Sequence, residues 1–328
     1  MLRIFRTNQM LFGLLLVFYA AALRSPVFFI EMPNTSGHFG IAGDFMGIAR
    51  LADHQWFHIL SIPILLIHAI AINVMVAEHR LAREVNLFPG LVYILITSSL
   101  PEFIPMSAPL LANTFLIIAV WIAMTTYKVP SCADRIFNIG FWVAIASLVY
   151  FSHIVFIFLG VAGLNIMRSF NIRERLILFS GLFVPYLLLG VYYFWNGELS
   201  EFIQRQFVAQ FDYFSFDTAY YWGAYIGWAV MGGLLLVALF NSGNYLLKTQ
   251  IQVQKKINLL FWALLIAALS LLVQQQIDVA HLLILAVPLS VLISFNFTML
   301  KPRIAEAVHL VAVAIVLVYQ YRSLIFTE

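Results

Sequence analysis

The stretch that decides the fold is "LVYILITSSLPEFIPMSAPLLANTF", residues 91–115. Two apolar runs flank a short segment in which Pro101, Pro105 and Pro109 recur at every fourth position. Proline lacks a backbone N–H and clashes with the preceding turn of a helix, so the first helix must end within about a dozen residues of its start. The stretch therefore predicts a hairpin of two helices joined by an irregular turn.

The composition places this hairpin in a membrane. The chain has 328 residues, of which 63% are hydrophobic and 10% charged, and its mean hydropathy is +0.95. A water-facing domain needs more polar side chains to cover its surface. The apolar segments are roughly 15 to 23 residues long, close to the about 20 that a helix needs to cross the hydrocarbon core. We expect an all-α, polytopic integral membrane protein.

About eleven transmembrane helices can be placed. They are expected at 10–30, 57–77, 91–104, 107–127, 136–151, 153–167, 176–195, 218–241, 258–274, 280–298 and 304–321. At about twenty residues each they occupy roughly 220 positions, which leaves little for a soluble domain. We expect one transmembrane domain over 1–328, with a first outer loop at 31–56 and an amphipathic outer loop at 196–217.

The basic residues orient the bundle. With a cytoplasmic N-terminus, 14 of the 18 Lys and Arg residues lie in inner loops, and the outer side keeps Arg24, Arg50, Arg205 and Arg322. Because cytoplasmic loops carry an excess of basic residues, the N-terminus is expected inside. Eleven crossings then place the C-terminus outside.

A second pair of short segments, 136–151 and 153–167, has 16 and 15 residues. Each spans roughly 24 Å, less than the about 30 Å of the hydrocarbon core. We expect both hairpins to turn below the outer surface and to leave a depression there. Glu102 and His153 lie at the two turns and are candidates for substrate binding. Alternatively, Glu102 caps the next helix and His153 bonds a backbone carbonyl.

The first outer loop gathers charge in "GDFMGIARLADHQWFHI", residues 43–59. Its titratable and charged side chains are Asp44, Arg50, Asp53, His54 and His58. Asp44 and Asp53 are nine residues apart, so one continuous helix would place them near one face. His54 and His58 are about one turn apart and could bind a phosphate when protonated, or a divalent cation when neutral.

These residues suit one reaction class. The chain contains no Walker loop, dinucleotide fingerprint, HExxH motif or paired CxxC. A carboxylate can take a proton from an acceptor hydroxyl while a cation stabilises a departing phosphate. This combination suits glycosyl transfer from a polyprenyl-phosphate sugar, with Asp44 or Asp53 as base and Arg50, His54 or His58 on the phosphate. An ordinary solvated loop would have the same residues, so both interpretations stay open.

Other features concern packing. Leu199, Phe202, Ile203, Phe207 and Phe211 recur at near-helical spacing and predict an interfacial amphipathic helix, which guides a lipid substrate or anchors the loop. Polar groups within the spans are expected to bond across the bundle, and Gly232–Gly233 to permit close helix approach. The polar groups are His68, Asn73, Asn113 and His309.

The segments "MLRIFRTNQ" (1–9), "SSLPEFIPMSAPLLANTFLIIAVW" (98–121) and "NIGFWVAIASLVYFSHIVFIFLG" (138–160) resemble a family of polytopic inner-membrane proteins from Bacteroidota. The resemblance extends over most of the chain and implies a location rather than an activity. More distantly, the architecture is similar to the membrane domain of polyprenyl-phosphate-dependent glycosyltransferases of the C superfamily. That similarity implies a catalytic acidic residue among Glu31, Asp44 and Asp53, although the loop lacks an adjacent acidic pair.

Two other functions fit the same sequence. One is a non-catalytic membrane subunit of a cell-envelope assembly or secretion complex, and the other is a small-molecule or lipid transporter. The expected partners are membrane lipid, a polyprenyl-phosphate-linked sugar and a membrane-protein partner, with no nucleic acid. No resident cofactor is expected, apart from the divalent cation that the histidines could hold.

Overall fold

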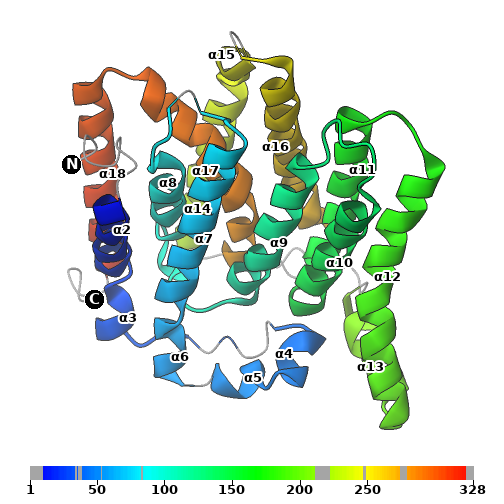
Figure 1. The fold of residues 1–328 in the computed structure, drawn as a ribbon. Coiled ribbons are helices and arrows are strands. Elements are labelled where there is room, and N and C mark those ends of the chain that lie inside the picture. The colour runs from blue at the N-terminus through cyan, green and yellow to red at the C-terminus, as the bar shows by residue number, and fades with distance from the viewer. Residues whose placement is uncertain are drawn as a thin grey trace.

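The computed structural model of the protein describes residues 10–33, 35, 39–52, 54–82, 84–210, 222–246, 249–273 and 279–322. Every regular element in these ranges is a helix, which confirms the predicted all-α class. The longer helices run up and down beside one another, and the short helices α4, α5 and α6 lie across one end of the bundle (Figure 1).

Each of the eleven predicted segments overlaps one of the longer helices. These helices are α2 (Met10–Leu23), α7 (Ser61–Glu78), α8 (Phe88–Thr97), α9 (Ala108–Met124), α10 (Ala133–Val149), α11 (Ile157–Met167), α12 (Ile172–Trp195), α14 (Trp222–Phe240), α16 (Ile251–Leu269), α17 (Leu283–Met299) and α18 (Pro302–Gln320). Shorter α-helices are α3 (Pro26–Phe29), α4 (Ile41–Phe45), α5 (Ile48–Leu51), α6 (Gln55–Ile59), α13 (Leu199–Gln206) and α15 (Ser242–Leu246). The 3-10 helices are η2 (Pro101–Phe103), η3 (Phe151–Phe156), η4 (Val208–Gln210), η5 (Ser270–Val273) and η6 (Val279–Leu282).

Five helical stretches are long and apolar enough to cross a membrane. They are Gln55–Glu78, Ile172–Trp195, Ile251–Leu269, Val279–Met299 and Pro302–Gln320. These stretches indicate a membrane protein, as the composition predicts. The number of crossings and the sides on which the termini lie stay predictions.

The two predicted hairpins are broken where the sequence predicts. Helix α8 has 10 residues, or about 15 Å at 1.5 Å per residue, and it ends at Thr97 before the proline-rich turn. Helix α9 begins only at Ala108. In the second hairpin α10 ends at Val149, and the 3-10 helix η3 leads into α11.

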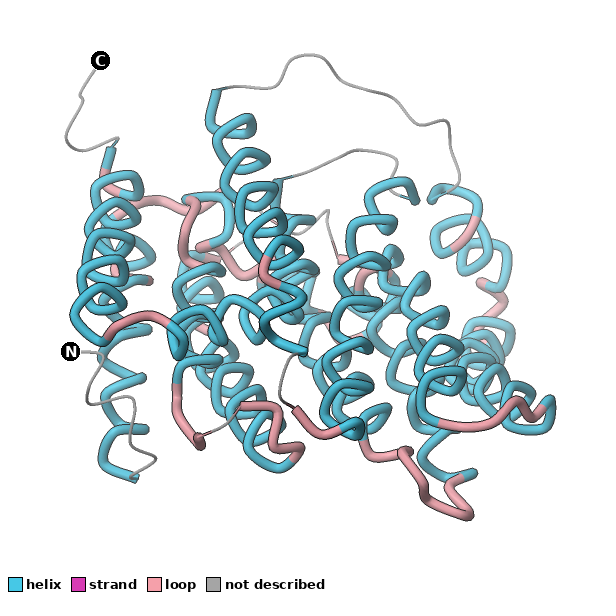
Figure 2. The backbone as a smooth tube through the Cα atoms, turned by 90° about the horizontal axis from the view of Figure 1, so that it is seen from above, coloured by secondary structure: helices cyan, strands magenta, loops and turns pink. Residues whose placement is uncertain are grey.

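Helices α8 and α17 form the centre of the bundle, and α12 and α18 lie at its edges (Figures 1 and 2). Every residue of α8 is buried. In the most apolar part of α17, 78% of residues are buried, against 28% in α12 and 17% in α18. The edge helices therefore expose apolar side chains that water would not solvate but hydrocarbon would.

The turn between α8 and α9 takes its hydrogen-bond partners from distant segments. Arg24 follows α2 and is fully buried, and its guanidinium donates to the carbonyls of Thr97, at 2.9 Å, and Ile104. Gln320, at the end of α18, donates to the carbonyl of Ser98. Prolines and the helix break leave these carbonyls without helical partners, so the side chains replace the missing donors.

The other end of the turn is held in the same way. The hydroxyl of Thr35 donates to the carbonyl of Met106 at 2.8 Å, and the backbone N–H of Met106 donates to Nδ1 of His58 at 3.2 Å. Thr35 comes from the predicted first outer loop, and His58 comes from α6. The irregular backbone of this turn is thus satisfied by protein groups, as a membrane interior would require.

The closest helix approach joins α10 and α12. A methyl carbon placed on Gly181 of α12 would lie 2.1 Å from the carbonyl oxygen of Phe137, and one on Gly140 of α10 would lie 2.0 Å from that of Leu178. Small residues let backbones touch in this way. The expectation for Gly232–Gly233 is wrong, because a methyl carbon at either position meets no atom within 4 Å.

We expect Gly181→Ala to destabilise the protein by about 1–3 kcal/mol, because the added methyl group must push α12 away from α10. Thermal unfolding of the detergent-solubilised chain measures the effect. Gly232→Ala is the matched control, since its methyl group meets open space and alanine is the better helix former. Equal melting temperatures for the two variants would contradict the close approach.

We expect Arg24→Leu to destabilise the protein by roughly 3 kcal/mol, because each buried acceptor left unpaired costs about 1–3 kcal/mol. The carbonyls of Thr97 and Ile104 both lose their donor in this variant. Arg50→Leu removes an exposed arginine from the first outer loop and should leave the melting temperature nearly unchanged. A similar small effect at Arg24 would show that the turn does not depend on it.

Candidate functional site

The predicted first outer loop contains two short helices, α4 and α5, rather than one longer helix. Gly47 adopts a left-handed conformation with φ of 70° and separates α4 from α5. Glycine has no Cβ and takes this conformation at little cost, so the chain turns here. Asp44 and the described residues that precede Asp53 therefore do not lie on one continuous helix. Asp53 itself lies outside the described residues.

Asp44, on α4, forms an ion pair with Arg205 of α13. Arg205 also lies 3.3 Å from the carboxylate of Glu201, one turn earlier in the same helix. The side chains of Arg205 and Asp44 are 50% and 28% exposed, so solvent reaches both, although the Oδ2 atom of Asp44 that contacts Arg205 is buried. The structure thus pairs Asp44, a predicted catalytic carboxylate, with Arg205. The sequence places Arg205 in the amphipathic outer loop but does not link it to Asp44.

Two contacts hold Asp44 in place. The N–H of Gly40, just before α4, donates to the carbonyl of Val149 at the end of α10, at 2.8 Å. On the other side, Phe45 packs edge-to-face against Tyr192 of α12, with ring centroids 4.9 Å apart. Helix α4 is therefore fixed between α10 and α12, and Asp44 with it.

Helix α13 confirms the predicted amphipathic segment over the part that the structure describes. Phe202 is buried and stacks on Tyr193 of α12, with ring centroids 5.5 Å apart, while Glu201 and Arg205 are exposed. Phe202 thus packs on the bundle and the charged face lies beside α4, whereas Ile203, also predicted for the apolar face, is 46% exposed. Phe211 and the rest of the predicted aromatic stretch to 217 lie outside the described residues.

The other charged groups of the first outer loop are not gathered around one point. Arg50, on α5, is exposed. His54 is exposed just before α6 and stacks on Trp56 with ring centroids 6.2 Å apart. His58 is 1% exposed, and its Nδ1 accepts the hydrogen bond from Met106. The two histidines therefore lie in different environments, one open to ligands and one engaged in the hairpin turn.

Glu102, in η2, lies beside Arg322, which follows α18. The closest oxygen and nitrogen of the two side chains are 3.9 Å apart. The guanidinium of Arg322 also lies over the ring of Tyr319, 4.3 Å from its centroid. The side chain of Glu102 is 18% exposed, so this pair lies at the border between the bundle and its surroundings.

His153, in η3, is fully buried. Its Nε2 donates to Oδ1 of Asn113 at 3.3 Å, and the amide of Asn113 donates to the carbonyl of Leu283 at 2.9 Å. Nearby, Tyr150 and His281 are hydrogen bonded at 2.9 Å. His153 thus belongs to a polar network inside the bundle and is not exposed in an outer depression.

Most of the polar groups predicted to bond across the bundle do so. His68 bonds Tyr93 and Thr114, at 2.9 and 2.7 Å. Asn73 accepts from the N–H of Gly90 at 2.7 Å. His309 is the exception, because neither of its buried ring nitrogens has a hydrogen-bond partner among the residues that the structure describes.

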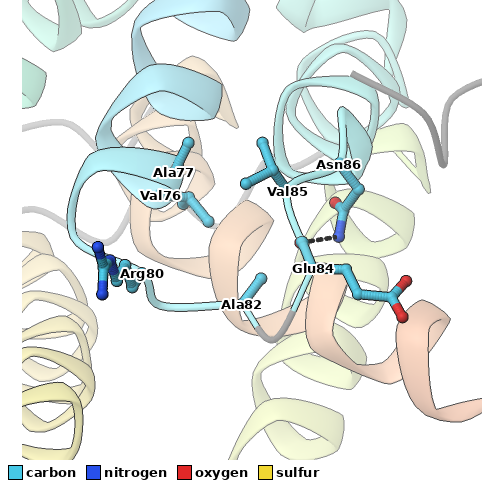
Figure 3. A pocket seen from close by; sticks show the side chains of 7 residues that line it. All are labelled: Val76, Ala77, Arg80, Ala82, Glu84, Val85 and Asn86. Carbon is cyan, nitrogen blue, oxygen red and sulfur yellow. Dashed lines mark hydrogen bonds between the residues drawn. The ribbon is translucent and has the colours of Figure 1, made fainter. Parts of the chain in front are cut away.

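Among the described residues, no group of three or more His, Cys, Asp or Glu side chains could hold a metal ion. The opposite end of the bundle carries a small cavity of about 250 Å³ between the end of α7 and the start of α8 (Figure 3). Arg80, Glu84 and Asn86 are among its lining residues. The amide of Asn86 donates to the carbonyl of Glu84 at 2.9 Å and closes this turn.

No family model, no curated protein and no solved structure matches the chain.

Proposed function

We propose that this protein is a glycosyltransferase of the bacterial inner membrane that acts on a polyprenyl-phosphate-linked sugar at the periplasmic leaflet. The observation that carries the proposal is the Asp44–Arg205 ion pair, which is open to ligands and lies on α4 and the amphipathic α13. A base and a phosphate-binding cation are the two groups that such a transfer needs.

In the proposed resting state, Arg205 holds the carboxylate of Asp44. A substrate phosphate at the membrane interface competes for the guanidinium, which binds phosphate oxygens as readily as carboxylate oxygens. Arg205 then stabilises the phosphate, and Asp44 is released as a base. Glu201 keeps the guanidinium oriented from the same helix.

Asp44 takes the proton from an acceptor hydroxyl. The hydroxyl oxygen forms a bond to the anomeric carbon of the sugar, and the bond from that carbon to the phosphate oxygen breaks. The electron pair of this bond leaves with the polyprenyl phosphate, whose added charge Arg205 stabilises. The products are the glycosylated acceptor and polyprenyl phosphate, and no redox partner is needed.

The remaining candidates have different proposed roles. Arg50 and His54 are exposed on the same loop and are available to a substrate phosphate or to an acceptor. Asp53 stays a second candidate for the base. His58 and His153 are proposed to position backbone and side chains, because each is buried and hydrogen bonded within the protein.

We expect Asp44→Asn to lower the transfer rate by at least 100-fold, because a positioned general base contributes about 10²–10⁴-fold. The measurement is release of polyprenyl phosphate from a radiolabelled polyprenyl-phosphate sugar by the purified protein in nanodiscs. Arg205→Gln should mainly weaken binding of polyprenyl phosphate. Glu198→Gln is the matched control, because Glu198 is an exposed carboxylate at the start of the same helix without a proposed role, and this variant should keep the transfer rate within a few fold. An Asp44→Asn variant with unchanged turnover would overturn the proposal.

A second candidate function is a membrane subunit of a cell-envelope assembly or secretion complex. The observation that favours it is the exposed aromatic face at the end of α12, where Phe194 and Trp195 are 66% and 86% exposed. Such a face suits a protein partner as well as lipid. A stoichiometric partner that co-purifies with the native chain and is lost in Phe194→Ser/Trp195→Ser would favour this function.

A further inference from the structure

An apolar groove runs along the edge of the bundle between α18 and the central helices. Its volume is about 510 Å³, within the about 300–1,000 Å³ typical of small-molecule sites. One wall is α18, and the others are α8, α14 and α17. Along α18 the groove extends from Val308 to Tyr319, which are eleven positions or about 16 Å apart.

The groove exists because α18 packs loosely on the bundle. Its main neighbour is α2 at the edge of the molecule (Figure 1). The lining side chains of α14 recur at helical spacing, at Ile226, Val230, Leu234 and Val237. Val308 and Ile315 of α18 are 47% and 63% exposed, so this wall presents apolar surface. A hydrocarbon chain would remove that surface from water favourably.

One end of the groove is polar and cationic. Tyr319 lines the groove, and the guanidinium of Arg322 lies over its ring. The side chain of Arg322 is 38% exposed and only 3.9 Å separates it from Glu102, at the limit of an ion pair. An anion at this position would gain a charge-assisted bond to a guanidinium that already stands at the border of the bundle.

We propose that this groove is a binding site for an anionic phospholipid, with one acyl chain between α18 and α14 and the headgroup phosphate on Arg322. The length and apolar lining of the groove fit the chain, and the cation at its end fits the phosphate. A zwitterionic headgroup gains less there, since its own cation offsets the attraction to Arg322.

The groove lipid is distinct from the proposed glycosyl donor. Helix α18 lies at one edge of the bundle and α13 at the opposite edge in both views (Figures 1 and 2). A headgroup held by Arg322 therefore cannot reach the Asp44–Arg205 pair. The occupant is a bound membrane phospholipid rather than a second copy of the substrate.

Native mass spectrometry of the full chain tests this site. The detergent-purified protein is exchanged into phosphatidylglycerol or into phosphatidylcholine with the same acyl chains, and bound lipid is counted after washing. We expect one phosphatidylglycerol retained per chain, with at least a fivefold preference over phosphatidylcholine. Arg322→Gln should abolish this preference, and Ala312→Trp, which fills the groove, should reduce retention of both lipids by about tenfold.

Three controls keep the result interpretable. Ala314→Trp adds the same bulk to an exposed position of α18 that does not line the groove and should retain the lipid. Asp44→Asn should also retain it, so failure of the catalytic proposal leaves this one intact. Arg322→Gln changes a partly exposed side chain, so this variant should fold and still tests the site if Ala312→Trp fails to fold. Equal retention of both lipids by the native chain, or displacement of phosphatidylglycerol by an equal amount of polyprenyl phosphate, would overturn the proposal.

Discussion

The rest of the structure depends on how the broken backbone between α8 and α9 finds its hydrogen-bond partners. In a hydrocarbon environment each unsatisfied polar group costs several kcal/mol. The proline-rich turn leaves several backbone groups without a helical hydrogen-bond partner. Arg24, Thr35, His58 and Gln320 provide the missing partners. Because these side chains come from four separate segments, one turn fixes the positions of α2, the first outer loop, α6 and α18 together.

The Asp44–Arg205 pair and the Arg322 end of the groove lie at the same end of the bundle. Different contacts hold the helices that form each of these two sites. On one edge, Gly140 and Gly181 bring α12 against α10, and the hydrogen bond from Gly40 to Val149 brings α4 to the same place. Arg205 and Asp44 meet as a result. On the other edge, Gln320 anchors the end of α18 to the turn, while the rest of α18 packs loosely on the bundle and leaves the groove.

The polar residues at this end thus divide by burial. His58 and His153 are buried and bond protein groups, which makes them part of the framework. Asp44, Arg205 and Arg322 keep partial exposure, and in both proposals a phosphate competes with a carboxylate for the guanidinium of Arg205 or Arg322. In a low-dielectric environment such exchangeable pairs are the groups able to recognise a charged lipid headgroup.

The sequence by itself determined the helical class, the membrane environment and the break in each short hairpin. The length of an apolar segment and the position of a proline affect only the nearby backbone, so their consequences can be predicted without knowing the fold. Pro101 ends α8 wherever α8 packs. The tertiary structure alone decided which charges meet. Asp44 and Arg205 are 161 positions apart and Glu102 and Arg322 are 220 apart, and no local pattern links them. Only the packing of α12 on α10, and of the end of α18 on the turn, brings each pair together.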